Sequence, residues 1–192
     1  MAQMIPRTLK DIPRATPGER RVFSLLATLP KDWYVWYDMG IGKMSREVYP
    51  DFIILDPDRG ILILEVKDWS IANISAMTME RFIIQINHSP VSFKNPILRC
   101  REYSLELCNL LQQDRLLVHK SGPYQGKLTF NWDYHCVFPN ISREEYSTFE
   151  INGIKLQDII NVNYLITKDD LEEFGKSPEN MRDRMHGLFQ GL

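Results

Sequence analysis

Two segments of the chain carry the signals that start an amphipathic helix. Thr16, Pro17 and Glu19 supply a capping hydroxyl, a proline at the first helical position and an acid three residues after the cap. Apolar residues then recur at a spacing of three or four up to residue 29. Asn95 and Pro96 form a similar start before a second periodic stretch. The pattern therefore predicts helices over residues 17–29 and 95–112.

Short apolar runs bounded by turn-forming residues predict the strands. The two central runs, 49–55 and 61–67, are separated by Asp-Pro-Asp-Arg-Gly at 56–60, which is a strong turn signal. Both alternating faces of these runs are apolar, as is typical of strands covered on both sides. The other predicted strands are 33–39, 81–86, 134–138 and 164–167, and the other predicted helices are 142–149, 169–174 and 177–189.

The order of these elements predicts the fold class and the organisation of the chain. A helix, three strands, a helix and a further strand favour an α/β fold, in which a mixed β-sheet carries helices on both faces. We expect residues 1–15 to form an extended arm, 16–140 a core domain, and 141–192 an extension of helices and a strand.

Composition narrows the class of protein. The chain has 192 residues, of which 44% are hydrophobic and 25% charged, as in an ordinary globular domain. No apolar run approaches the roughly 20 residues of a membrane-spanning helix, and the first residues do not resemble a signal peptide. Three cysteines without metal-type spacing favour a reduced, cytoplasmic compartment. The net charge of −2 is not typical of a protein that coats nucleic acid by charge alone. It is compatible with an enzyme that binds nucleic acid at one local site.

Polar groups interrupt one apolar face at the end of the second central strand. Glu65 and Lys67 share that face with the apolar residues before them. If the turn closes symmetrically about Asp58, Asp51 lies opposite Glu65, with the two Cβ atoms about 5 Å apart. Two facing carboxylates repel unless a proton or a cation lies between them. The arrangement depends on the register, because a slip of one residue would separate the two acids.

Such a pair suggests a metal site. Two carboxylates with a backbone carbonyl between them, that of Val66, suit a hard cation such as Mg²⁺. A water polarised by the metal is a nucleophile for phosphodiester attack, and the ammonium of Lys67 could stabilise the charge that grows on phosphorus.

The same residues carry a family resemblance. Pro50-Asp51, followed after thirteen residues by Glu65-Val66-Lys67, is similar to the PD-(D/E)xK nuclease signature. With the surrounding segments 17–23, 51–55 and 64–69, and with Asn95-Pro96 and Tyr103, residues 15–112 resemble the nuclease-related domain (NERD) family. Segments 137–141 and 166–171 are similar to the region after that domain in bacterial fusions to UvrD/Rep-type helicases.

The resemblance implies a DNA endonuclease of restriction-endonuclease-like fold that depends on Mg²⁺ or Mn²⁺. DNA would be its substrate, and a helicase in the same or another chain its partner. By position, Asp51 and Glu65 would be the metal ligands, Lys67 the catalytic lysine and Glu19 an accessory acid.

Basic residues near this site are candidates for binding nucleic acid. Related nucleases often carry Gln-x-x-x-Tyr on the helix after the sheet, whereas this chain has Arg99 and Tyr103, which share a helix face. A guanidinium could bind phosphate or pair with a site carboxylate, but it cannot replace the acceptor of an amide. The candidate nucleic-acid-binding residues are Arg20, Lys94, Arg99 and Tyr103.

Simpler explanations exist for single residues. Glu19 completes a capping box with Thr16, and Glu65 with Lys67 could be a salt bridge at a strand end. Segment 40–45 lacks the first glycine of a phosphate loop and is interpreted as a hairpin loop. No two of the histidines have ligand spacing, and we interpret them as core or surface residues: His88, His119, His135 and His186. The alternative functions are a catalytically silent DNA-binding or docking module and a nuclease that acts on RNA.

Overall fold

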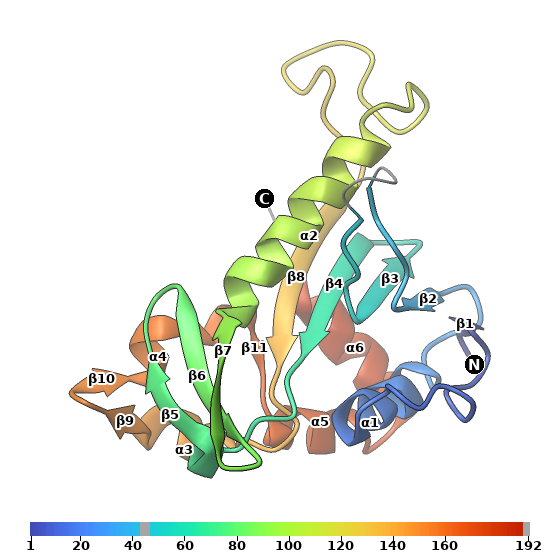
Figure 1. Cartoon of the computed structure of the whole chain (residues 1–192). Coiled ribbons are helices and arrows are strands. Elements are labelled where there is room, and N and C mark those ends of the chain that lie inside the picture. Colours follow the sequence, from blue (N-terminus) through green and yellow to red (C-terminus); the bar gives the residue numbers. More distant parts are fainter. Residues whose placement is uncertain (43–46, 190–192) are drawn as a thin grey trace.

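A six-stranded β-sheet forms the centre of the protein. The computed structural model describes residues 1–42 and 47–189 (Figure 1). In spatial order the strands are β1 (Gln3–Ile5), β2 (Tyr34–Tyr37), β3 (Phe52–Asp56), β4 (Gly60–Val66), β8 (Asn131–Val137) and β11 (Leu165–Ile166). The pairs β2–β3 and β3–β4 are antiparallel, and the pairs β1–β2, β4–β8 and β8–β11 are parallel. The sheet is therefore mixed, as predicted.

The β3–β4 hairpin has the register that the symmetric turn predicts. Leu55 pairs with Ile61, and Ile53 pairs with Ile63, so the turn is centred on Asp58. Gly60 closes the turn with a φ of +124°, which only glycine adopts without strain. A Cβ at this position would also lie 2.0 Å from a backbone oxygen of β8. The turn composition thus fixes the register that the site requires.

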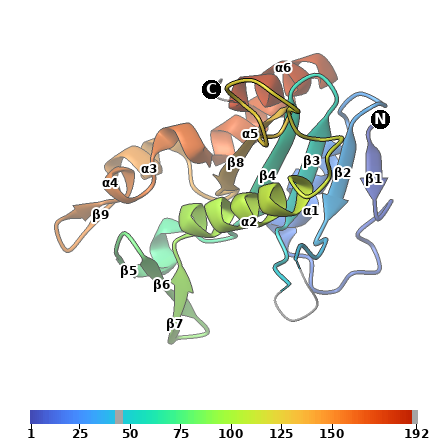
Figure 2. The same ribbon diagram turned by 90° about the horizontal axis from the view of Figure 1, so that it is seen from above.

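Helices cover both faces of the sheet. On one face, α1 (Pro17–Leu26), α5 (Lys168–Phe174) and α6 (Pro178–Leu188) pack in one core with Leu62 and Leu64 of β4. On the other face, α2 (Pro96–Leu111) lies over the sheet (Figure 2) and contacts β4 and β8. Its Tyr103 and Leu107 pack with Ile63. Odd and even residues of β4 therefore point to opposite layers. The predicted α/β fold class, with helices on both faces, is confirmed.

A second, three-stranded antiparallel sheet lies beside the start of α2 (Figure 1). It consists of β5 (Ile74–Met77), β6 (Arg81–Ile86) and β7 (Ser89–Lys94), after a 3₁₀ turn, η1 (Ile71–Asn73). Only β6 was predicted, because β7 is mostly exposed and carries serines and a proline in place of apolar residues. This sheet shares a core with Trp69 and with the C-terminal elements α3 (Arg143–Thr148) and α4 (Leu156–Ile159).

The remaining elements were partly predicted. The small hairpin β9 (Glu150–Ile151) and β10 (Ile154–Lys155), and the 3₁₀ turn η2 (Val162–Tyr164), were not. Leu9 of the predicted arm and Met185 of the predicted extension are buried in the same core as α1. The division of the chain at residues 15 and 140 stays a prediction. Residues 43–45 of the predicted loop 40–45 lie outside the described residues, but Ile41 within it forms an antiparallel bridge with Val48, which follows it.

Candidate active site

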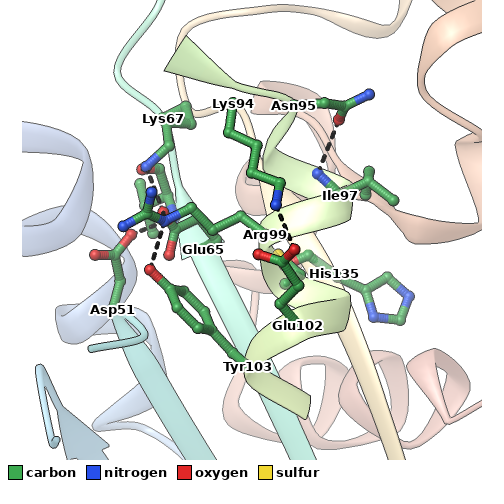
Figure 3. Close-up of polar contacts among 12 residues, drawn as sticks. Asp51, Glu65, Lys67, Lys94, Asn95, Ile97, Arg99, Glu102, Tyr103 and His135 are labelled. Atoms are coloured by element: carbon green, nitrogen blue, oxygen red, sulfur yellow. Dashed lines mark hydrogen bonds and ion pairs between the residues drawn. The ribbon is translucent and has the colours of Figure 1, made fainter. Parts of the chain in front are cut away.

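Asp51 and Glu65 meet at the end of the β3–β4 hairpin (Figure 3). The side chain of Glu65 is only 5% exposed and lies on the α2 side of the sheet. Asp51 directly precedes β3, and its Oδ2 accepts a hydrogen bond of 2.6 Å from the backbone N–H of Val66. This bond holds the carboxyl of Asp51 against the strand that carries Glu65. The structure therefore brings the two predicted acids together.

The environment of Asp51 disfavours its charged form. Burial, followed by the charge of Glu65, raises the pKa of Asp51 to about 8. The charge of Lys67 and the hydrogen bond from Val66 oppose this effect but do not cancel it. Without a cation, the carboxyl group of Asp51 therefore keeps its proton to a higher pH than an ordinary aspartate.

Lys67 is bound to the second acid. Its Nζ donates to Oε1 of Glu65 at 2.6 Å and to the carbonyl of Val66 at 3.3 Å. Burial alone would lower the pKa of Lys67, but the charges of Glu65 and Asp51 outweigh it and raise the pKa. Lys67 is thus a charged ammonium directly beside the carboxylate pair.

Glu19 caps α1 and also lies near the acid pair. Its Oε2 accepts from the N–H of Thr16 at 3.0 Å, which completes the predicted capping box. The same oxygen accepts from the hydroxyl of Tyr37 at 2.7 Å, and the charge of Glu19 contributes to the raised pKa of Asp51. Glu19 therefore lies within electrostatic reach of the acid pair. Its part in catalysis stays a prediction.

Tyr37 and Asp68 support the site but were not predicted from the sequence. Tyr37 pairs with Phe52 across β2 and β3, and burial with the nearby Glu19 raises its pKa. Oδ2 of Asp68 accepts from the N–H of Gly18 at 2.9 Å. A Cβ at Gly18 would lie 2.0 Å from the other oxygen of Asp68, so only glycine fits there. These contacts hold the start of α1, and hence Glu19, at the end of the sheet.

Arg99 and Tyr103 reach the site from α2 (Figure 3). Nε of Arg99 donates to the hydroxyl of Tyr103 at 2.6 Å and lies 4.0 Å from Oε1 of Glu65. The side chain of Arg99 is half exposed, so one side of it is open to a ligand. The sequence suggested that this guanidinium contacts either a phosphate or a site carboxylate, and the structure shows the contact with the carboxylate of Glu65.

The other two candidate nucleic-acid-binding residues are engaged elsewhere. Lys94 forms an ion pair with Glu102 at the start of α2. Arg20 donates to the carbonyls of Leu9 and Ile12, at 2.5 and 2.7 Å, and so ties the N-terminal segment to α1. Arg20 therefore has a structural role, and contacts of Lys94 and Arg20 with nucleic acid stay predictions.

The carboxylate pair fits a hard divalent cation. Oε2 of Glu65 is buried and has no hydrogen-bond partner among residues 1–42 and 47–189. Asp51 and the carbonyl of Val66 add oxygen donors beside it, and oxygen is the donor atom that Mg²⁺ prefers. A cation would satisfy this oxygen and offset the repulsion from Glu65 that, after burial, raises the pKa of Asp51.

The cysteines and the histidines are not part of this site. Cys100, Cys108 and Cys136 are free and buried, and burial raises the pKa of Cys108 to about 12. His135 is buried, which lowers its pKa to about 4. His186 lies in one group with Asp56 and Asp58, at the turn end of the hairpin.

Comparison with known proteins places the chain in a family. A family model described as nuclease-related domain matches residues 14–139, which include Glu19, the acid pair, Lys67 and Arg99. No curated protein and no solved structure matches the chain. Among the described residues, no helix has the length and apolar character needed to cross a membrane. Because the family model covers more than half of the sequence, the chain belongs to the nuclease-related domain (NERD) family.

Proposed function

We propose that this protein is a divalent-metal-dependent DNA endonuclease that hydrolyses phosphodiester bonds. The observation that carries the proposal is the adjacent pair of Asp51 and the buried Glu65, with Nζ of Lys67 only 2.6 Å from Glu65. Membership of a nuclease-related family supports the same reaction class.

The residues of the site divide into metal-binding and charge-stabilising groups. Asp51, Glu65 and the carbonyl of Val66 would hold Mg²⁺ or Mn²⁺. The bound metal would supply a polarised water and a counter-charge for the phosphate oxygens. Lys67 would then donate to the attacking water or to a phosphate oxygen and stabilise the negative charge that develops there. Glu19 would add negative potential from the α1 side.

Binding of DNA requires a local surface of positive charge on the protein, because the chain as a whole carries a net charge of −2. Arg99 is half exposed beside the acid pair and would contact a phosphate near the scissile bond. Beyond the other end of α2, the exposed side chains of Arg115, Lys120 and Lys127 would contact phosphates further along the duplex. A helicase, in the same or another chain, is the partner that this proposal expects.

The test is cleavage of plasmid DNA by the purified chain with Mg²⁺ or Mn²⁺. We expect Lys67→Met and Glu65→Gln to reduce the cleavage rate by at least about 100-fold. The matched control Lys176→Met removes an exposed lysine of a surface ion pair and should cleave normally. Competition with RNA of the same length identifies the preferred nucleic acid. Absence of cleavage of any nucleic acid with either metal would overturn the proposal.

A catalytically silent DNA-binding or docking module is the second candidate. The observation that favours it is the close approach of two cations, Lys67 and Arg99, to Glu65, which balances the carboxylate without a metal. This candidate predicts DNA binding without turnover and an unchanged DNA affinity in Asp51→Asn. Calorimetric titration of Mn²⁺ separates the two, because only the nuclease should bind the metal in a way that Asp51→Asn abolishes.

A further inference from the structure

A buried carboxylate lies at the turn end of the β3–β4 hairpin. Asp56 is the last residue of β3 and is 0% exposed. Its Oδ1 accepts a hydrogen bond of 2.9 Å from the N–H of Asp58, which orders the turn. Its Oδ2 is also buried but has no hydrogen-bond partner within the described residues. A buried carboxylate oxygen needs a donor or a cation beside it, so the group that faces this oxygen is decisive.

An imidazole from the C-terminal helix faces this oxygen. Nε2 of His186, on α6, lies 2.9 Å from Oδ2 of Asp56. Nε2 is itself buried and makes no hydrogen bond within the described part of the chain. The ring of His186 stacks on Trp33, with the ring centroids 5.5 Å apart and the planes at 21°. The imidazole is therefore held in place with Nε2 directed at the carboxylate.

Asp58 completes a group of three potential ligands. A carboxylate oxygen of each aspartate and a ring nitrogen of His186 all lie within 4.8 Å of one another. Asp58 is exposed, so its side chain can adjust to a ligand. The group is separate from the candidate active site, because β4 spans seven residues and its two ends are about 20 Å apart.

We infer that Asp56, Asp58 and His186 form a second metal site, which takes a transition-metal dication such as Zn²⁺. One imidazole and two carboxylates suit Zn²⁺ better than Mg²⁺, which prefers oxygen donors alone. Ligand atoms around a tetrahedral Zn²⁺ are about 3.3 Å apart, which is close to the separation of Asp56 and His186. A cation here would satisfy both buried atoms and link α6 to the central hairpin.

A metal site requires more residues than a simple ion pair between Asp56 and a protonated His186. The ion pair needs only these two residues, whereas the metal site also needs Asp58. Because Asp58 is exposed, its removal leaves the fold and the ion pair intact. Asp58→Ala is therefore the variant that separates the two explanations. Its matched control is Asp183→Ala, which removes an exposed acid on α6 that is not one of the three ligands.

The experiment measures Zn²⁺ binding by calorimetry, and Co²⁺ binding by visible absorption, in the full chain carrying Asp51→Asn to weaken the first site. In this background we expect one equivalent of Zn²⁺, with an affinity at least tenfold lower after Asp58→Ala or His186→Ala and unchanged after Asp183→Ala. At the same Zn²⁺ concentration, the melting temperature of the control should rise more than that of the Asp58→Ala protein.

Equal Zn²⁺ affinity in the Asp58→Ala and Asp183→Ala proteins would overturn the inference, even if His186→Ala lost binding. Absence of Zn²⁺ binding in the Asp51→Asn background would overturn it as well. The test does not depend on nuclease activity, so its failure leaves the proposed function untouched.

Discussion

Replacing Asp51 with asparagine should stabilise the metal-free protein at alkaline pH. Asparagine keeps an oxygen that accepts from the N–H of Val66, and it removes a carboxyl group that burial and Glu65 keep from ionising. The candidate active site thus contains a carboxyl group whose charged form the fold tolerates poorly without a cation. The same substitution should abolish metal-dependent cleavage, since Asp51 is one of the proposed ligands.

The size of the effect depends on the pKa of Asp51, which is about 8 in the folded protein against an ordinary value of 3.8. An acid with a raised folded pKa binds its proton more tightly in the folded state. Its unfavourable effect is therefore absent below pH 3.8, grows with rising pH, and is complete above about pH 8. Between pH 5 and pH 8, the free energy of unfolding of the wild type should therefore fall by about 4 kcal/mol relative to that of Asp51→Asn, at roughly 1.4 kcal/mol per pH unit. Because Asp51 is partly exposed, solvent screening reduces this to about 2–3 kcal/mol.

Urea denaturation followed by circular dichroism, in EDTA at pH 5 and pH 8, measures the effect. Asp51→Asn should gain stability over the wild type as the pH rises, and the exposed control Asp183→Asn should not. Saturating Mn²⁺ should stabilise the wild type but not Asp51→Asn. A lower stability of Asp51→Asn than of the wild type at pH 8, or a difference independent of pH, would contradict this account of the buried carboxyl group.

Three further substitutions test the hairpin and the site. Gly60→Ala should lower the free energy of unfolding, measured by urea denaturation, by more than about 2 kcal/mol, because it adds a backbone clash to a positive φ. The control Gly153→Ala, which also has a positive φ but nothing near its Cβ, should lower it by about 1 kcal/mol. Equal losses in the two variants would argue against the clash. Tyr37→Phe loses the hydrogen bond to Glu19 and should cost about 1 kcal/mol by the same assay; no change would mean that water replaces the hydroxyl. Arg99→Ala should weaken DNA binding and reduce by about one the slope of log affinity against log salt; an unchanged slope would exclude a phosphate contact.

The features that could be predicted from the sequence are those whose conformation depends on residues close to one another in the sequence. The cap of α1 depends on Thr16 and Glu19, three residues apart, and the hairpin register depends on the five residues of its turn. The polar strand β7 was missed because its place in the small sheet comes from pairing with β6 and not from its own composition. Tyr37 and Asp68 were missed because their partners in α1 are brought to them only by the packed fold.

The β3–β4 hairpin carries both proposed metal sites, yet only one of them could be found in the sequence. The strand period of two and the turn at Asp58 are enough to place Asp51 opposite Glu65, because both residues belong to the hairpin itself. The same turn places Asp56 at the other end, but the partner of Asp56 there is His186, which reaches it through the packing of α6 against the sheet. No periodicity or local spacing connects these two residues, so a histidine without ligand spacing in the sequence becomes a candidate ligand only in the folded chain.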